Sequence, residues 1–125
     1  MSQASPLWSP SPEAVASAAI SQFARRGEQL SGTKLDSYRA LHDWSINDRE
    51  AFWSLIWDYC GIVGERGEQV LVDGDKMPGA KFFPDAKLNF AENLLKKSGS
   101  AEAIVFRGED KVERVLSWDE LRALV

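Results

Sequence analysis

The sequence of 125 residues contains a single cysteine, Cys60. Because it has no second cysteine to pair with, no internal disulfide can form, and a metal cluster built on several cysteines is excluded. Such low cysteine usage agrees with a reducing compartment.

The sequence also lacks a long apolar run. No run approaches the roughly eighteen apolar residues that a membrane-spanning helix requires. The opening stretch MSQASPLWSPSP has neither the basic nor the apolar segment of a secretion signal. We therefore expect a cytoplasmic protein without membrane association.

Positive charge is not in excess. The 15 Lys and Arg residues are outnumbered by 19 Asp and Glu residues, which gives a net charge of -4. Because proteins meet phosphate backbones with basic surfaces, nucleic acid is not expected as a partner. The hydrophobic content of 44% is high enough for a buried core, so most of the chain is expected to fold.

Three helices are predicted in the first half of the chain. The first spans residues 12–26, with Ser11 as its cap, Pro12 in its first position and Gly27 as its stop. A short helix follows over LDSYRALHDW, residues 35–44, where apolar residues recur at helical spacing.

The third helix has the strongest signal. Asn47 and Glu50 form a capping-box pattern at its start, and Gly61 is a stop at its end. Its sequence predicts one apolar stripe and a second one beside it, and so wide an apolar surface must be buried. The first stripe consists of Phe52, Leu55, Ile56 and Tyr59, and the second of Trp53 and Trp57.

Residues 61–87 contain several glycines and prolines and a single short apolar run, which predicts a long, ordered connection with one short strand at 70–72. A helix restarts at Asn89, which is its expected cap with Glu92 as partner, and its two leucines, Leu94 and Leu95, are expected to be buried. Capping does not explain Asn93, which lies one turn further on. We therefore expect its side chain to hydrogen-bond to backbone, in the preceding connection or in a domain outside the sequence.

The last residues have a different character. Two strands are predicted at 103–107 and 112–116, joined by a polar turn over 108–111. Ser117 and Glu120 then form a capping box for a helix with Leu121 and Val125 on one face. Because an isolated hairpin is marginal in water, we expect this part to begin a larger domain and the sequence to be an N-terminal fragment.

These patterns predict an α/β fold, α+β as a fragment, in which a mainly helical cap precedes a β-hairpin and a helix. We divide the chain into a flexible lead-in at 1–10, a helical region at 11–100 and the start of a truncated domain at 101–125. Leu7 and Trp8 in the lead-in are candidates for docking on a partner surface.

Two loop motifs have candidate chemistry. The glycines of GIVGERG, residues 61–67, could cradle a phosphate, but such a loop follows a strand and carries a lysine and a hydroxyl that are missing here. DGD at 73–75 lacks the further oxygen ligands of a calcium loop. We therefore predict a helix stop with a turn at the first motif and a tight turn at the second.

Some single side chains are also candidates for catalysis or ligand binding. His42 lies beside Asp43 and near Ser45, but without a nucleophile elbow it is interpreted as a helix-end histidine. Cys60 has no basic neighbour nearer than Arg66 in sequence and is interpreted as a packed thiol. The tryptophans at 44, 53 and 57 could stack on a ligand, but packing against another domain is favoured because no basic residues interleave them.

The order of four segments resembles the N-terminal region of acyl-coenzyme A synthetases, in the adenylate-forming superfamily. These segments are LWSPSPE, LHDWSINDREAFWSLIWDYCGIVGERGE, MPGAKFFPDAKLNFAENLL and LSWDEL. The resemblance runs from Leu7 to Val125. Within it, the segment AENLL at 91–95 resembles the acetoacetyl-type pattern rather than the acetyl-type one.

The resemblance implies a longer enzyme that activates acetoacetate with ATP and magnesium to an adenylate and transfers the acyl group to coenzyme A. That reaction would feed ketone-body carbon into biosynthesis or storage polymers. The family's phosphate loop, adenine motif, hinge aspartate and C-terminal lysine have no counterpart in these residues. We therefore expect no catalytic, cofactor-binding or metal-binding residue in this chain. The alternatives are a ligase for acetate or propionate and a stand-alone, non-catalytic interaction module.

Overall fold

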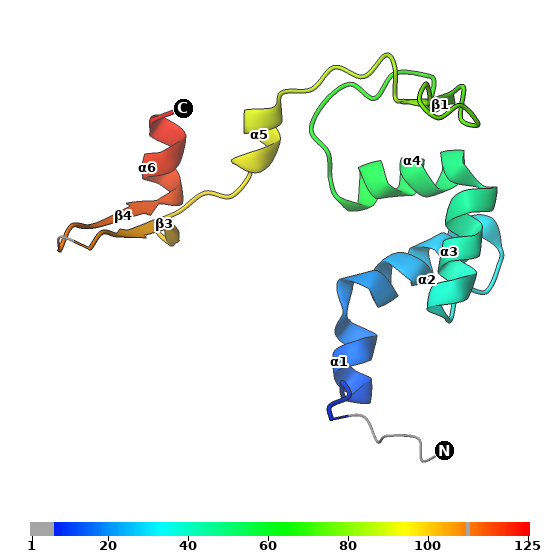
Figure 1. Ribbon diagram of the computed structural model, residues 1–125, viewed down its shortest axis with the longest axis horizontal. Helices are drawn as coiled ribbons and strands as arrows, with labels where there is room; N and C mark the ends of the chain where they lie inside the picture. Colours follow the sequence, from blue (N-terminus) through cyan, green and yellow to red (C-terminus); the bar gives the residue numbers. More distant parts are fainter. Residues whose placement is uncertain (1–6, 110) are drawn as a thin grey trace. The chain divides into compact units, whose positions relative to one another are not determined.

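The computed structural model describes residues 7–109 and 111–125 (Figure 1). Contacts divide the chain into two compact units. Unit 1 comprises Met1–Gly61 and Gln69–Pro84, and unit 2 comprises Ile62–Glu68 and Asp85–Val125. Among the described residues, no helix combines the length and the apolar character needed to span a membrane.

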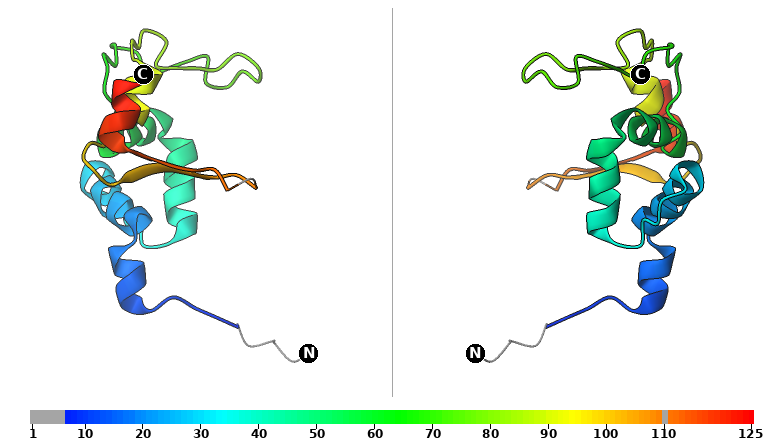
Figure 2. Two further views of the ribbon diagram at one scale, coloured as in Figure 1. Left: turned by 90° about the vertical axis from the view of Figure 1, so that its left-hand side faces the viewer. Right: turned by 90° about the vertical axis from the view of Figure 1, so that its right-hand side faces the viewer.

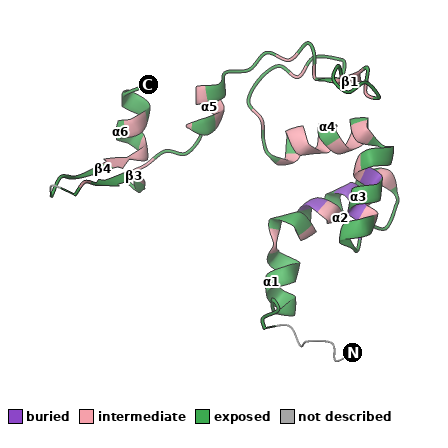
Figure 3. Cartoon of the chain, in the orientation of Figure 1, coloured by how far each residue is buried: buried purple, intermediate pink, exposed green. Residues whose placement is uncertain are grey.

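Unit 1 is mainly helical (Figures 1 and 2). Its elements are α1 (Pro12–Ser17), α2 (Ala19–Ser31), α3 (Tyr38–Asn47), α4 (Arg49–Tyr59), β1 (Leu71–Val72) and β2 (Lys81–Phe82). The two strands pair antiparallel, with Leu71 opposite Phe82. The buried core consists of Phe23, Leu35, Leu41 and Trp44, and the purple segments of Figure 3 show that it lies around α2 and α3.

The predicted first helix is longer than expected and broken. Ser11 caps it as predicted, since its Oγ accepts the Ala14 N–H at 3.2 Å. At Ala18 the backbone is extended, with ψ 141°, and this residue separates α1 from α2. Gly27 is not the stop: α2 continues to Ser31 and ends at Gly32, whose φ of 68° is left-handed.

Gly27 serves packing instead. A Cβ at this position would lie 2.8 Å from Leu35 Cδ1 and 2.9 Å from Trp44 Cζ3, both in the core. Glycine therefore lets the α2 backbone approach the buried indole, a long-range requirement that the local sequence does not reveal.

The next two helices are shifted relative to their predicted starts. Ser37 caps α3, while Leu35 lies before it, buried, with its N–H donating to Glu28 Oε1 at 2.7 Å. The predicted cap Asn47 is wrong, because α3 runs through it and Asp48 caps α4. The predicted stop at Gly61 is confirmed by its φ of 58°, directly after the end of α4.

The first apolar stripe of α4 is confirmed. Its side chains pack against the buried core of unit 1, as the width of the stripe demanded. Phe52 meets both Phe23 and Trp44 edge-on, with ring centroids 5.6 and 5.5 Å apart. Tyr59 meets Phe23 at 5.3 Å, and its hydroxyl donates to the Ala19 carbonyl at 2.9 Å.

Unit 2 begins with an irregular segment and ends in a hairpin and a helix. Its elements are α5 (Phe90–Leu94), β3 (Glu102–Arg107), β4 (Glu113–Ser117) and α6 (Trp118–Ala123). The antiparallel pairing of β3 and β4, orange in Figure 2, confirms the predicted hairpin. Gly108 N–H closes its turn by donating to the Val112 carbonyl at 2.8 Å. Residue 110 of the predicted turn lies outside the described residues.

The capping box of α6 is confirmed, whereas the predicted helical face of Leu121 and Val125 and the predicted burial of Leu94 are wrong. Ser117 Oγ accepts the Glu120 N–H at 3.2 Å, and Glu120 Oε2 accepts the Ser117 N–H at 2.8 Å. Val125 lies beyond α6 and is 78% exposed, so it does not share a helical face with Leu121. Leu94 is 61% exposed, because the short α5 turns it away from the neighbours that partly bury Leu95.

We predict that Gly27→Ala lowers the free energy of unfolding by about 1–3 kcal/mol, because the added methyl overpacks the core. Urea denaturation of the whole chain measures the effect. In Gly27→Ala/Leu35→Ala, one of the two close neighbours is gone, so the double variant is expected to lose less than the sum of the single changes. Full additivity would contradict the contact, as would a gain in stability from Gly27→Ala.

We further predict that stability depends on the ionisation of Glu120. Hydrogen bonds from the Ser117 N–H and hydroxyl hold the pKa of Glu120 below its usual value. The stabilisation is therefore present above about pH 4.3, the usual value, and is lost as the pH falls through the lower folded value. Denaturant unfolding between about pH 6 and pH 3 should show this loss in the wild type and a smaller one in Glu120→Gln. Equal profiles for the wild type and Glu120→Gln would refute the prediction.

Candidate functional site

Two hydrogen bonds, here called the clasp, join the side chain of Asn93 on α5 to the backbone of Val63. Asn93 Oδ1 accepts the Val63 N–H at 2.9 Å, and Nδ2 donates to the Val63 carbonyl at 2.8 Å. Nδ2 also donates to the Asn89 carbonyl at 2.9 Å. One amide side chain thus satisfies both backbone groups of a residue that has no secondary structure. The predicted backbone hydrogen bonding of Asn93 is confirmed, and its partner lies in the preceding connection.

Asn89 holds the start of the same helix. Its Oδ1 accepts the Glu92 N–H at 3.2 Å, which confirms the predicted cap. The two asparagines therefore have different roles. Asn89 caps α5, and Asn93 binds α5 to the irregular segment before it.

The glycine segment 61–67 fits a packing role and not a phosphate loop. Glu65 and Lys87 exchange two backbone hydrogen bonds, of 2.8 and 2.9 Å, so this segment pairs with the stretch before α5. A Cβ on Gly64 would lie 2.7 Å from the Lys87 carbonyl oxygen, and one on Gly67 would lie 2.7 Å from Asp85 Cβ. The segment follows α4 and opens no helix, so its geometry does not suit the phosphates of ATP.

The DGD segment forms the predicted tight turn. Lys76 N–H donates to the Asp73 carbonyl at 2.9 Å, and Lys76 Nζ pairs with Asp73 Oδ1 at 2.9 Å. Arg49 binds the other side of the turn, through the Gly74 carbonyl and the Asp75 carboxylate. Over residues 7–109 and 111–125, no group of three or more His, Cys, Asp and Glu side chains could hold a metal ion.

The two single-residue interpretations both need correction. His42 lies in the middle of α3 and not at a helix end; its ring stacks on Tyr38 with centroids 6.0 Å apart. Its Nδ1 is 3.7 Å from Asp43 Oδ1 on the exposed surface. Cys60 is exposed rather than packed, because it follows the last residue of α4, where the helix no longer turns it toward the core.

The predicted packing of the tryptophans on protein is confirmed, with partners inside unit 1 where another domain was expected. Trp44 is 7% exposed in the core of unit 1. Trp53 contacts Phe82 and Trp57 contacts Phe83, in each pair with centroids 5.1 Å apart. Both phenylalanines belong to residues 69–84 of unit 1, a segment for which the sequence predicts only a connection.

Each unit also has a shallow groove that the sequence did not reveal. One groove of unit 1 has a volume of about 430 Å³ and is lined largely by apolar side chains of α2, α3 and α4, with His42 and Cys60 among them. A second groove of unit 1, of about 810 Å³, is lined by residues of α1, α2 and α3 and of the segments beside them. The groove of unit 2 has a volume of about 450 Å³, and Glu92, Lys96 and Arg122 are among its lining residues.

Residues 38–94 match the family model described as acetyl-coenzyme A synthetase N-terminus. The match covers α3, α4, the irregular segments of both units and α5, including the Asn93 clasp. Over these residues the chain is thus similar to the N-terminal region of acyl-coenzyme A synthetases, the class that the resemblance implied.

The similarity to known proteins is more specific than the class. Acetoacetyl-coenzyme A synthetase of Rhizobium meliloti is 52% identical over 120 residues, which are 96% of this chain and 18% of that protein. Malonamoyl-CoA synthetase vrtB of Penicillium aethiopicum is 36% identical over 111 residues, 82% of this chain and 15% of that protein. The solved acetoacetyl-CoA synthetase from Streptomyces lividans matches with a TM-score of 0.81 and 31% identity, over 95% of this chain and 19% of that one.

The chain is thus related, over nearly its whole length, to the N-terminal region of acetoacetyl-coenzyme A synthetases. The acetoacetyl-type pattern at 91–95 indicated the same subfamily, and the α/β fold class is confirmed. The chain spans only 15–19% of the length of the relatives named above.

We predict that Asn93→Leu lowers the free energy of unfolding by about 1–3 kcal/mol, because the N–H and carbonyl of Val63 lose their partner. Asn93→Asp keeps the acceptor and loses the donors, so it should have an intermediate effect. Denaturant unfolding of the whole chain measures both. The control Asn47→Leu, at an exposed helix end, should change stability by less than about 0.5 kcal/mol. If Asn93→Leu proved neutral or stabilising, the clasp would have no energetic role.

Proposed function

We propose that this chain is the N-terminal part of an acetoacetate–CoA ligase. The enzyme converts ATP, acetoacetate and coenzyme A into acetoacetyl-CoA, AMP and diphosphate, with magnesium as the metal ion. The observation that carries the proposal is the 52% identity to an acetoacetyl-coenzyme A synthetase across 96% of this chain. The working place of the enzyme is the cytoplasm, and its partners include neither nucleic acid nor membrane.

Within that enzyme the role of these residues is structural, and none of them is catalytic, cofactor-binding or metal-binding. Two observations support this role. The glycines at 64 and 67 are used for close backbone packing rather than for phosphate binding. The perturbed carboxyl of Glu120 serves a helix cap and lies in no cluster of catalytic groups.

The proposal also assigns the parts of the chain. Residues 1–10 are a lead-in, 11–100 a helical region, and 101–125 the start of the adenylation domain, whose remainder is their partner. The hairpin supports the last assignment, because apolar side chains of both strands are 44–54% exposed. These side chains are Ile104, Val105, Phe106 and Val115. A two-stranded sheet with such surfaces is stable only when something covers it.

The identity of the acid that the enzyme activates can be tested directly. We predict that the longer protein encoded by the gene forms AMP and diphosphate at least about tenfold faster, in kcat/KM, with acetoacetate than with acetate or propionate. A coupled assay of AMP formation with each acid, at saturating ATP and coenzyme A, measures the ratio. Acetoacetate carries a second carbonyl that the two control acids lack, so the ratio reports recognition of that group.

Two outcomes would overturn parts of the proposal. A preference for acetate or propionate would leave the ligase class standing and reject acetoacetate as substrate. The lack of a Gly-rich Ser/Thr loop in the codons that follow position 125 would reject the ligase itself and favour the non-catalytic interaction module.

A further inference from the structure

Residues 69–84 of unit 1, here called the strap, form a hairpin that satisfies many of its own backbone groups. β1 and β2 pair within it, and Phe83 N–H donates to the Val70 carbonyl at 2.8 Å. At its tip, Lys76 N–H donates to the Asp73 carbonyl at 2.9 Å, and Ala80 N–H donates to the Lys76 carbonyl at 3.1 Å. The strap therefore does not rely on its neighbours for these hydrogen bonds.

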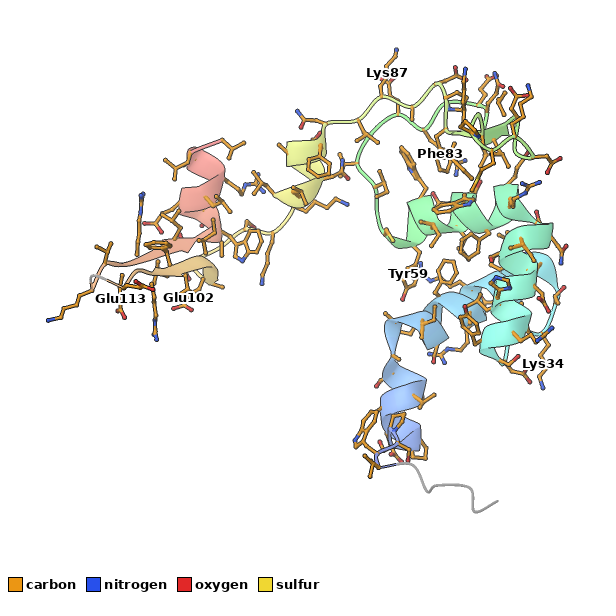
Figure 4. The ribbon with its side chains drawn as sticks, in the orientation of Figure 1. Lys34, Tyr59, Phe83, Lys87, Glu102 and Glu113 are labelled. Atoms are coloured by element: carbon orange, nitrogen blue, oxygen red, sulfur yellow. The ribbon has the colours of Figure 1, made fainter. Side chains whose placement is uncertain are left out.

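The strap is attached to α4 through side chains of that helix. Over the described ranges 7–109 and 111–125, the backbone hydrogen bonds of the strap run within it, and none reaches the backbone of α4. At the tip, Arg49 Nη1 donates to the Gly74 carbonyl and Nη2 donates to Asp75 Oδ1, each at 2.6 Å. At the base, Phe82 and Phe83 lie against Trp53 and Trp57. Figure 4 labels Phe83, whose ring lies beside α4.

Several side chains of the attachment are exposed to solvent, and the backbone of the strap is strained at one residue. Trp53 is 36% exposed and Phe82 45% exposed, so water already reaches one aromatic pair. The Asp75 side chain is 94% exposed, which leaves the ion pair open to screening by salt. Phe83 has a φ of 46°, a left-handed conformation that costs free energy for a bulky residue.

We propose that the strap is a conformational latch, which detaches from α4 and re-attaches to it as one folded unit. The fork of Arg49 closes the latch at the tip, and the aromatic pairs close it at the base. The strap differs from an isolated hairpin because Glu65 and Lys87, just outside its two ends, are paired by two backbone hydrogen bonds. Detachment therefore keeps the hairpin's own hydrogen bonds and uncovers Trp53 and Trp57, so α4 alternates between a covered and an exposed aromatic face. The free energy of this local opening is small compared with that of global unfolding.

The latch can be tested by separating exposure of the indoles from melting of the hairpin. The whole chain is labelled with 5-fluorotryptophan, and a soluble gadolinium chelate reports by fluorine NMR how far each indole is exposed. Hydrogen exchange of the Phe83 and Lys76 amides reports the hairpin. For Arg49→Ala we expect about a tenfold larger open population, the size of effect that loss of a charge-assisted hydrogen bond produces. The signals of Trp53 and Trp57 should broaden more, while Trp44 and both amides stay as in the wild type.

Two controls keep the test specific. Lys34→Ala removes another exposed ion pair of unit 1, with Asp36 at 2.7 Å, and should leave Trp53 and Trp57 unchanged. If Arg49→Ala fails to fold, Arg49→Lys keeps the charge without the fork, and added salt acts on the wild type. Either change should raise the open population severalfold and broaden the signals of both indoles. Unchanged indole exposure would overturn the proposal. So would an equal loss of protection at the Phe83 and Lys76 amides, because the strap would then melt rather than detach.

Discussion

The constraint on which the structure depends is the need to satisfy irregular backbone between α4 and α5. Nearly thirty residues there, 61–88, contain only two strands of two residues each. Each unpaired N–H and carbonyl in such a stretch costs free energy unless water or another group binds it. The chain meets this need with side chains. The amide of Asn93 hydrogen-bonds to the N–H and carbonyl of Val63, and the guanidinium of Arg49 donates to the Gly74 carbonyl. Glycines allow the close approach at which Glu65 pairs with Lys87.

Local signals made several elements predictable from the sequence. The caps at Ser11, Asn89 and Ser117 and the two strands of the hairpin depend on residues within a few positions of one another, so a pattern along the chain contains the needed information. The role of Asn93 was also foreseeable, because a polar residue that local capping leaves unexplained needs a partner elsewhere. The identity of that partner, Val63, was not foreseeable, since thirty residues separate the two.

The wrong predictions share the opposite cause. Gly27 looks like a stop because it follows two arginines, yet its role depends on an indole seventeen residues away in sequence. Asn47 and Asp48 are both acceptable caps, but α3 extends through Asn47, which leaves Asp48 to cap α4. The tryptophans of α4 were correctly assigned to packing, but their partners come from a segment with too little regular pattern to predict. The candidate site was thus predictable in its residues and not in its contacts.

The two units are interleaved along the chain, since unit 1 ends at Gly61, resumes at Gln69 and ends again at Pro84. No single cut in the polypeptide separates them: a break after Gly61 takes the strap from one unit, and a break after Pro84 takes the partner of Asn93 from the other. A gene recombination with one crossover in this region would damage both. Segments 62–68 and 69–84 can therefore be exchanged between related proteins without separating parts of one unit only when both of their flanking regions come with them.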